Sequence, residues 1–348
     1  MMSTRWSESV SAYNLIDYCL KECPKTKPID KIRYGIKKTI DEVTAHVGVK
    51  DVLDRINYVS TQGFTKELRD FIFDELKEKS EVADDSETAK EICSARGDWV
   101  LRHNNPPQSE LLRWIEDVAY DESLLLWHIA TELCYNTVEA GNNGGDSAYR
   151  NFCKVLSDYM LYLLVMQPTM MSAVSGIGRI RFRDTCAEAK KFFGNREWGQ
   201  IGACKHILDV NTEVEPVAVK GDRSKSVLFD ACRLAKHLRD NLEEEKKWVI
   251  MSKVWVEMLS YAASHCRAHN HAQQLSKGGE LVTFVWLLMA HLGLGEQFQI
   301  KEGHARAKLI VDKYLPLISR LGFQAVIRRF NSPWLCVLGG LNLFQPST

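Results

Sequence analysis

The stretch MSKVWVEMLSYA (Met251–Ala262) carries the clearest helical pattern of the chain. Its apolar side chains recur three and four residues apart, and this spacing places them on one face of an α-helix. These side chains are Met251, Val254, Trp255, Met258, Leu259 and Ala262. Because most helices in proteins are stabilised by packing of such a face, the stretch predicts a buried helix in a helical protein.

Other segments show related patterns. Val227–Leu238 has the same amphipathic spacing, whereas Glu122–Tyr135 and Phe152–Met166 are apolar almost all round and predict deeply buried helices. The apolar run Leu281–Leu294 is shorter than the roughly 20 residues that cross a bilayer, so it also predicts a core helix. We therefore expect a mainly α fold, a multi-helix globular bundle with at most one short strand pair.

Two segments interrupt the helical pattern. In Arg102–Glu110 the adjacent Pro106 and Pro107 predict a firm break, after which Ser109 is placed to cap the next helix. The segment from about Ile201 to Val219 is the hardest to assign, and its part ILDVNTEVEPVAV (Ile207–Val219) is the candidate for a short strand.

The composition is that of an intracellular globular protein. With 45% hydrophobic residues, the 348-residue chain has enough apolar material for about two domains or one large helical domain. Lysine plus arginine equals aspartate plus glutamate, at 45 each, so no overall basic field favours nucleic acid, and no nucleic-acid partner is expected. The ten cysteines are scattered, which predicts reduced, buried thiols in a reducing compartment. The N-terminal residues lack the apolar core of a signal peptide.

Several blocks of the chain resemble a plant protein family known as domain of unknown function 594. They include DESLLLWHIATELCY, LSDYMLYLLVMQPTMMS and the long block that begins WVIMSKVWVEMLSYAASHCRAHNHAQQLSKGGE. In the long block the order of tryptophans, histidines and paired glycines is unusual. The resemblance implies the soluble part of plant membrane proteins with several N-terminal transmembrane helices, and no activity is generally assigned to the family. Membrane association is therefore implied by the family, although no segment of this chain is expected to span a membrane.

The resemblance divides the chain into three parts. Residues 1–96 are expected to form a charged helical N-terminal region, and residues 97–313 the family-like helical core. Residues 314–348 are apolar and glycine-rich without a clear period, and they form an atypical tail.

A cluster of histidines follows the Met251–Ala262 stripe. If the helix continues, His265, Cys266 and His269 extend its buried face, with His271 close by. Two imidazoles four residues apart on a helix can share one metal ion, so zinc is the cofactor that this cluster would hold. The alternative is structural: histidines near a helix C-terminus interact favourably with the helix dipole. Structural zinc sites usually take ligands from two separate segments, and no distant partner stands out, so we favour the structural interpretation and expect no cofactor.

A polar loop precedes the Val227–Leu238 helix and is a candidate anion site. Its residues are Lys220, Arg223, Ser224, Lys225 and Ser226. Backbone N–H groups at a helix N-terminus bind phosphate, and Ser224 or Ser226 can cap the helix. A capped helix with solvated lysines and arginines explains the same residues, and this interpretation is favoured.

A basic patch is the third candidate. In GIGRIRFRDTCAE, Arg179, Arg181 and Arg183 face one way if the segment is extended and fan out if it is helical. Such a patch can contact anionic lipid. Pairing with the nearby Asp184 and Glu188 is the favoured alternative.

No complete catalytic motif is present. The sequence contains no GxSxG elbow. His128 and Glu132 lie one turn apart and can form an orienting pair, but in a helix this apolar a core histidine with satisfied hydrogen bonds is favoured. We therefore expect a non-catalytic interaction or scaffold module with a protein partner. The alternatives are a metal-dependent enzyme or metal-stabilised domain that uses His265 and His269, and a peripheral binder of anionic lipid or phosphate.

Overall fold

The computed structural model describes residues 8–23, 50–83, 85–137, 148–194, 196–212 and 226–294. These residues are mostly helical, with one small two-stranded antiparallel sheet, so the expected mainly α fold is confirmed. In chain order the elements are β1 (Ser9–Ala12), α1 (Leu15–Glu22), α3 (Lys50–Tyr58), β2 (Ser60–Gly63), α4 (Lys66–Val82), α5 (Ser86–Ser94), α6 (Asp98–His103), the 3-10 helix η1 (Ser109–Trp114), α7 (Tyr120–Asn136), α8 (Ala148–Met166), α9 (Gly178–Phe193), α10 (Gln200–Leu208), α12 (Val227–Asp240), α13 (Glu244–His265), α14 (Ala268–Ser276) and α15 (Leu281–His291).

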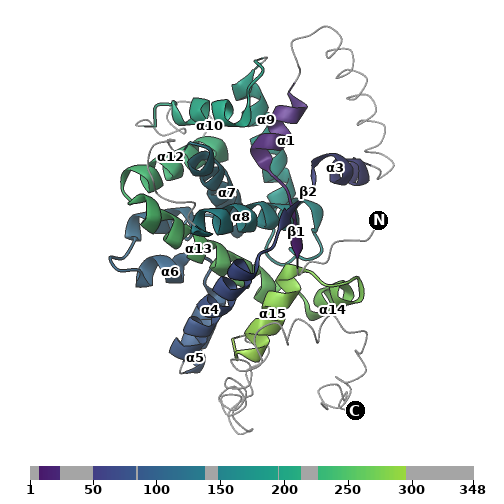
Figure 1. Ribbon diagram of the computed structural model, residues 1–348, viewed down its shortest axis with the longest axis vertical. Helices are drawn as coiled ribbons and strands as arrows, with labels where there is room; N and C mark the ends of the chain where they lie inside the picture. The colour runs from purple at the N-terminus through teal and green to yellow at the C-terminus, as the bar shows by residue number, and fades with distance from the viewer. Residues whose placement is uncertain are drawn as a thin grey trace.

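Helices α7 and α8 form the centre of the bundle (Figure 1). They pack against each other, α12 packs on α7, and α13 packs on both α8 and α15. Trp127 and Tyr159 from the two central helices are fully buried, as is Trp255 from α13. The apolar runs of α7 and α8 are therefore explained by burial on nearly every side. No helix of the described residues is long and apolar enough to cross a membrane.

The strand pair does not form where we expected a strand. β1 and β2 pair antiparallel, with Ser9 opposite Gly63 and Ala12 opposite Ser60, and β1 packs on α8. In the expected segment, Ile207 and Leu208 end helix α10, and residues 213–219 lie outside the described residues.

The helix boundaries agree only in part with the expected caps. Ser226 is the N-cap of α12, and its hydroxyl accepts a hydrogen bond from the Phe229 N–H at 3.3 Å. The expected cap at Ser109 is wrong, because Gln108 is the N-cap of η1 and no side chain caps it. The break that the two prolines predict is present, since α6 ends at His103.

The described parts of the N-terminal region share one hydrophobic core with the rest of the chain. Leu15 and Ile16 from α1 and Leu68 and Ile72 from α4 belong to the same buried cluster as the residues of α7, α8 and α13. The atypical tail, 314–348, lies outside the described residues.

Candidate functional site

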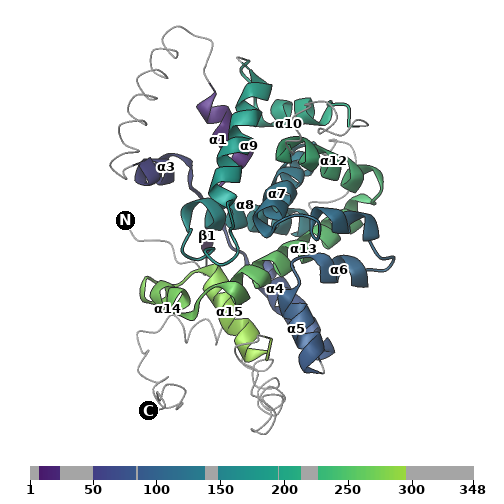
Figure 2. The same ribbon diagram turned by 180° about the vertical axis from the view of Figure 1, so that it is seen from behind.

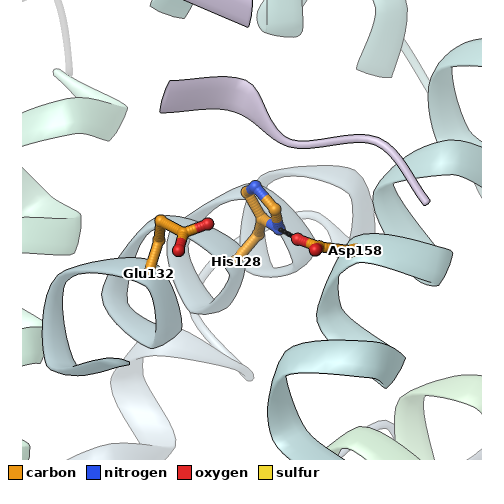
Figure 3. Close-up of side chains that lie close together, drawn as sticks. All are labelled: His128, Glu132 and Asp158. Atoms are coloured by element: carbon orange, nitrogen blue, oxygen red, sulfur yellow. Dashed lines mark ion pairs between the residues drawn. The ribbon is translucent and has the colours of Figure 1, made fainter. Parts of the chain in front are cut away.

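Helices α7 and α8 bring four ionisable side chains together in the interior. His128 and Glu132 lie one turn apart on α7, and Lys154 and Asp158 lie one turn apart on α8. Because residues four apart share a helix face, the two pairs meet where the helices pack. Figure 3 shows His128, Glu132 and Asp158, and the N-terminal segment, in pale purple, passes beside them. His128 is 0% exposed, Glu132 1% and Asp158 2%, so bulk water does not solvate these three side chains.

The ammonium of Lys154 joins the two carboxylates of this cluster. Its Nζ lies 2.8 Å from Glu132 Oε2 and 2.8 Å from Asp158 Oδ2. The side-chain amide of Asn136 donates to Glu132 Oε1 at 2.7 Å. A buried charge is tolerated only when it is paired and hydrogen-bonded, and both carboxylates meet that condition.

The hydrogen bonds of His128 determine its tautomer. The backbone N–H of Leu15 donates to His128 Nε2 at 3.2 Å, so Nε2 carries no proton. The proton of the neutral ring is therefore on Nδ1, which donates to the Ser157 hydroxyl at 2.8 Å and lies 4.0 Å from Asp158 Oδ1. Both ring nitrogens are thus engaged, as expected for a core histidine.

The N-terminal residues complete the shell around Asp158. Asn14 Nδ2 donates to Asp158 Oδ1 at 3.2 Å, and Gln62 Nε2 donates to Oδ2 at 2.6 Å. The Tyr13 N–H donates to the Asp158 backbone carbonyl at 3.1 Å. The cluster therefore fastens both the β1–α1 segment and β2 to helix α8.

Burial shifts the protonation equilibria of the cluster. It lowers the pKa of His128 to about 4, which keeps the ring neutral at ordinary pH. It raises the pKa of Glu132, an effect that the charge of Lys154 opposes. Burial also disfavours the charged form of Lys154, but Glu132 and Asp158 outweigh it, and the pKa of the ammonium is raised.

The cluster has the side chains of a metal site, but its geometry does not fit a bound metal. One potential ligand atom from each of His128, Glu132 and Asp158 lies within 4.8 Å of the others. However, the Lys154 ammonium bridges the two carboxylates at the place where a metal cation would bind. The backbone N–H of Leu15 donates to His128 Nε2, so the lone pair of that nitrogen is already used in a hydrogen bond. The lysine provides the positive charge, so we interpret the cluster as a closed structural network.

A second buried carboxylate, Glu257 on α13, joins three segments. Its Oε1 accepts hydrogen bonds from the backbone N–H groups of Gly97 (2.6 Å) and Trp99 (3.1 Å), and its Oε2 accepts from Val100 (3.2 Å). The Lys79 ammonium of α4 lies 2.6 Å from Oε2. Glu257 thus caps the N-terminus of α6, where a negative charge is stabilised by the free N–H groups.

The predicted metal ligands do not converge. Helix α13 ends at His265, the chain becomes extended at Cys266, and α14 begins at Ala268, so the expectation of one continuous helix is wrong. His265 and His269 are exposed, while the Cys266 thiol is buried and lies 4.0 Å from the Met170 sulfur. Among the described residues, the single group of three potential ligands is the one around His128, and these side chains are not part of it.

His271 is buried and has a structural role. Its Nε2 donates to the Ala263 carbonyl at 3.1 Å, and its Nδ1 accepts from the Thr283 hydroxyl at 3.0 Å. Burial lowers its pKa to about 4. The ring also stacks on Trp286, so His271 joins α14 to both α13 and α15.

The three arginines of the basic patch lie on helix α9 and fan out. Arg181 points inward and pairs with the buried carboxylate of Asp121, and it lies 3.2 Å from Glu122. Arg179 and Arg183 are exposed, one turn apart. The partners of Arg181 are therefore on α7, not the neighbouring acids Asp184 and Glu188.

One residue of the candidate anion site is described. Ser226 donates its hydroxyl proton to Glu188 Oε2 on α9 at 2.8 Å. Lys220, Arg223, Ser224 and Lys225 lie outside the described residues, so anion binding there stays a prediction.

Sequence reasoning did not identify Lys154, Asp158 or Lys79 as members of polar clusters. The spacing of Lys154 and Asp158 fits a pair on one helix face, but it does not indicate that Glu132 of α7 joins them. Glu257 offered a similar signal, because it interrupts an apolar stripe between Val256 and Met258. An acid inside a buried stripe requires a partner, although the sequence does not say which.

The fold and its clusters define a helical protein whose buried ionisable groups are tied into the structure. Residues 240–294, which contain α13, α14 and α15, match the model of the family described as "Protein of unknown function, DUF594". The match supports a relationship to that family over this segment. No curated protein and no solved structure matches the chain.

Proposed function

We propose that the protein is a non-catalytic helical interaction module, and that it is a plant member of the DUF594 family. The observation that carries the proposal is the closure of the buried clusters. The Lys154 ammonium pairs with the carboxylates of Glu132 and Asp158. The backbone N–H of Leu15 donates to the unprotonated ring nitrogen of His128. A general acid or base must be able to reach a substrate proton, and these groups are turned toward one another instead.

The second support comes from the outer surface at the start of α9. Ile177 and Ile180 are 55% and 49% exposed, and Arg179 and Arg183 are exposed beside them. Exposed apolar side chains that adjoin arginines are typical of binding surfaces. We assign the binding role to this face.

Affinity capture with matched baits tests the proposal. The baits are the folded wild-type chain, the variant Ile177→Ser/Ile180→Ser, and the control Ile201→Ser, which removes an equally exposed isoleucine from α10. We expect at least one partner that the wild type and the control retain and the double variant loses. Its binding is then measured directly with the purified partner.

Identical sets of captured proteins from all three baits, together with equal binding of the three baits to lipid vesicles, would contradict the assignment to α9. Circular dichroism of each bait verifies that the variants remain folded. A turnover that depends on His128 or Glu132 would contradict the non-catalytic role itself.

A further inference from the structure

The start of helix α9 combines the two surface properties that an interfacial membrane contact requires. Among the large hydrophobic side chains exposed in the described residues, Ile177 and Ile180 stand within one turn of each other, whereas Ile56, Val82 and Ile201 are separate. Single exposed hydrophobic residues are normal, but an adjacent pair forms a small apolar patch. Figure 2 shows α9 along the outer side of the bundle.

Basic side chains share this face. Arg179 and Arg183 flank Ile180, and the Arg183 guanidinium donates to the Arg179 carbonyl at 3.3 Å, which aligns it along the helix. Further along α9, Lys191 is also exposed, and Asp184 is the exposed acid among them. The face is therefore positive as well as apolar.

The helix start is fixed rather than free to fold inward. A Cβ at Gly178 would lie 2.6 Å from Leu164 Cδ1, so the backbone is packed directly on α8. Arg181 anchors the same turn through Asp121. The preceding turn is held by Asn270, whose side chain donates to the Thr169 carbonyl at 2.8 Å. Because these contacts hold the backbone, Ile177 and Ile180 stay exposed unless a partner covers them.

We propose that this face of α9 binds the surface of an anionic phospholipid bilayer, with Ile177 and Ile180 at the boundary between headgroups and acyl chains and with Arg179 and Arg183 at lipid phosphates. The proposal rests on the interaction role above and names its partner. The isoleucines and arginines alternate along residues 177–183, over less than two turns, so the partner must offer negative charge and an apolar layer at one place. The interface of an anionic bilayer offers both everywhere, which favours it over a protein partner.

Vesicle sedimentation tests the proposal with the full chain. The probes are vesicles of phosphatidylcholine alone and vesicles of phosphatidylcholine with phosphatidylserine. We expect a severalfold larger bound fraction with phosphatidylserine, and a decrease as salt is added, because salt screens exposed charges. Arg179→Gln/Arg183→Gln should abolish the preference for phosphatidylserine, and Ile177→Ser/Ile180→Ser should lower binding to both.

The control Arg196→Gln/Lys205→Gln removes the same charge at two other exposed positions and should bind like the wild type. Equal binding to the two vesicle types, or unchanged binding of the α9 arginine variant, would overturn the proposal. If vesicles do not bind while the α9 isoleucine variant loses a captured protein, the partner is a protein, and the interaction module survives without its lipid assignment. If neither is observed, both proposals fail.

Discussion

The ammonium of Lys79 lies 2.6 Å from Glu257 Oε2, although 178 positions separate the two residues in the chain. Both side chains are buried, and Glu257 also accepts three backbone hydrogen bonds at the start of α6. The Glu257 carboxylate thus connects α13 to α4 through the ion pair and to α6 through the backbone hydrogen bonds. The cluster around Lys154 does the same for the N-terminal segment, α7 and α8.

Removing the buried lysine should be far more costly than removing an exposed one on the same helix. Lys79→Met leaves the Glu257 carboxylate buried with only its N–H donors, and we expect a loss of about 3 to 5 kcal/mol in the free energy of unfolding. Lys66→Met breaks an exposed pair with Asp70 and should cost at most about 1 kcal/mol. Urea denaturation of both variants makes the comparison, and similar losses would show that Glu257 does not depend on Lys79.

Gly97 should tolerate no side chain, whereas Gly202 should. The backbone of Gly97 has φ of 125°, and a Cβ there would lie 2.5 Å from Ile115 Cδ1. Gly97→Ala should therefore destabilise the fold, by about 1 to 3 kcal/mol. In Gly202→Ala, within α10, the added Cβ contacts only the Trp198 ring, at 3.4 Å. This variant should raise the free energy of unfolding by about 0.5 to 1 kcal/mol. Thermal unfolding measures both, and a stable Gly97→Ala protein would refute the close packing of α6.

The stability of the protein should fall between pH 6.5 and pH 4. An ordinary histidine gains a proton near pH 6.5, whereas burial lowers the pKa of His128 to about 4. In this window the unfolded chain binds a proton that the folded chain does not. Acidification therefore removes up to about 1.4 kcal/mol per pH unit on account of His128.

The variant His128→Gln isolates this effect, because glutamine does not titrate. Its free energy of unfolding should decrease less steeply over the same pH range, by about the amount given above. Denaturation curves at several pH values supply the two slopes. Parallel slopes would mean that His128 is not buried as a neutral ring.

The basic patch should separate into one structural and two surface arginines. Arg181→Met leaves Asp121 and Glu122 without their cation, and a loss of about 3 kcal/mol is expected. Arg183→Met, on the exposed face of the same helix, should change stability by less than about 0.5 kcal/mol. Chemical denaturation distinguishes the two cases. Equal losses of stability in the two variants would contradict the arrangement in which Arg181 points inward and Arg183 faces the solvent.

Helices that carry a regular apolar period were predictable from the sequence, since the pattern itself is local. The stripes of α12 and α13 contain the buried residues that the spacing indicates, among them Leu234 and Met258. The position of the strand pair was not predictable, because β1 and β2 have four residues each and lie some fifty positions apart. Strands this short show no alternation that differs from the surrounding chain.

The end of α13 was missed for a similar reason. Neither glycine nor proline marks the break at Cys266, which coincides with tertiary contacts to the turn after α8, from Cys266 to Met170 and from Asn270 to Thr169. Long-range contacts of this kind decide which histidines are buried. For that reason His271 is a core residue and His265 is not.

The central claim is that the buried clusters are closed structural ties and that binding takes place at the surface. The zinc content of the untagged chain, measured by mass spectrometry after incubation with zinc and dialysis, tests it most directly. We predict far less than one zinc ion per chain. About one zinc ion per chain that is lost in Glu132→Gln/Asp158→Asn would contradict the claim, whereas zinc that is lost in His265→Ala/His269→Ala would lie at the exposed histidines and leave the buried clusters closed.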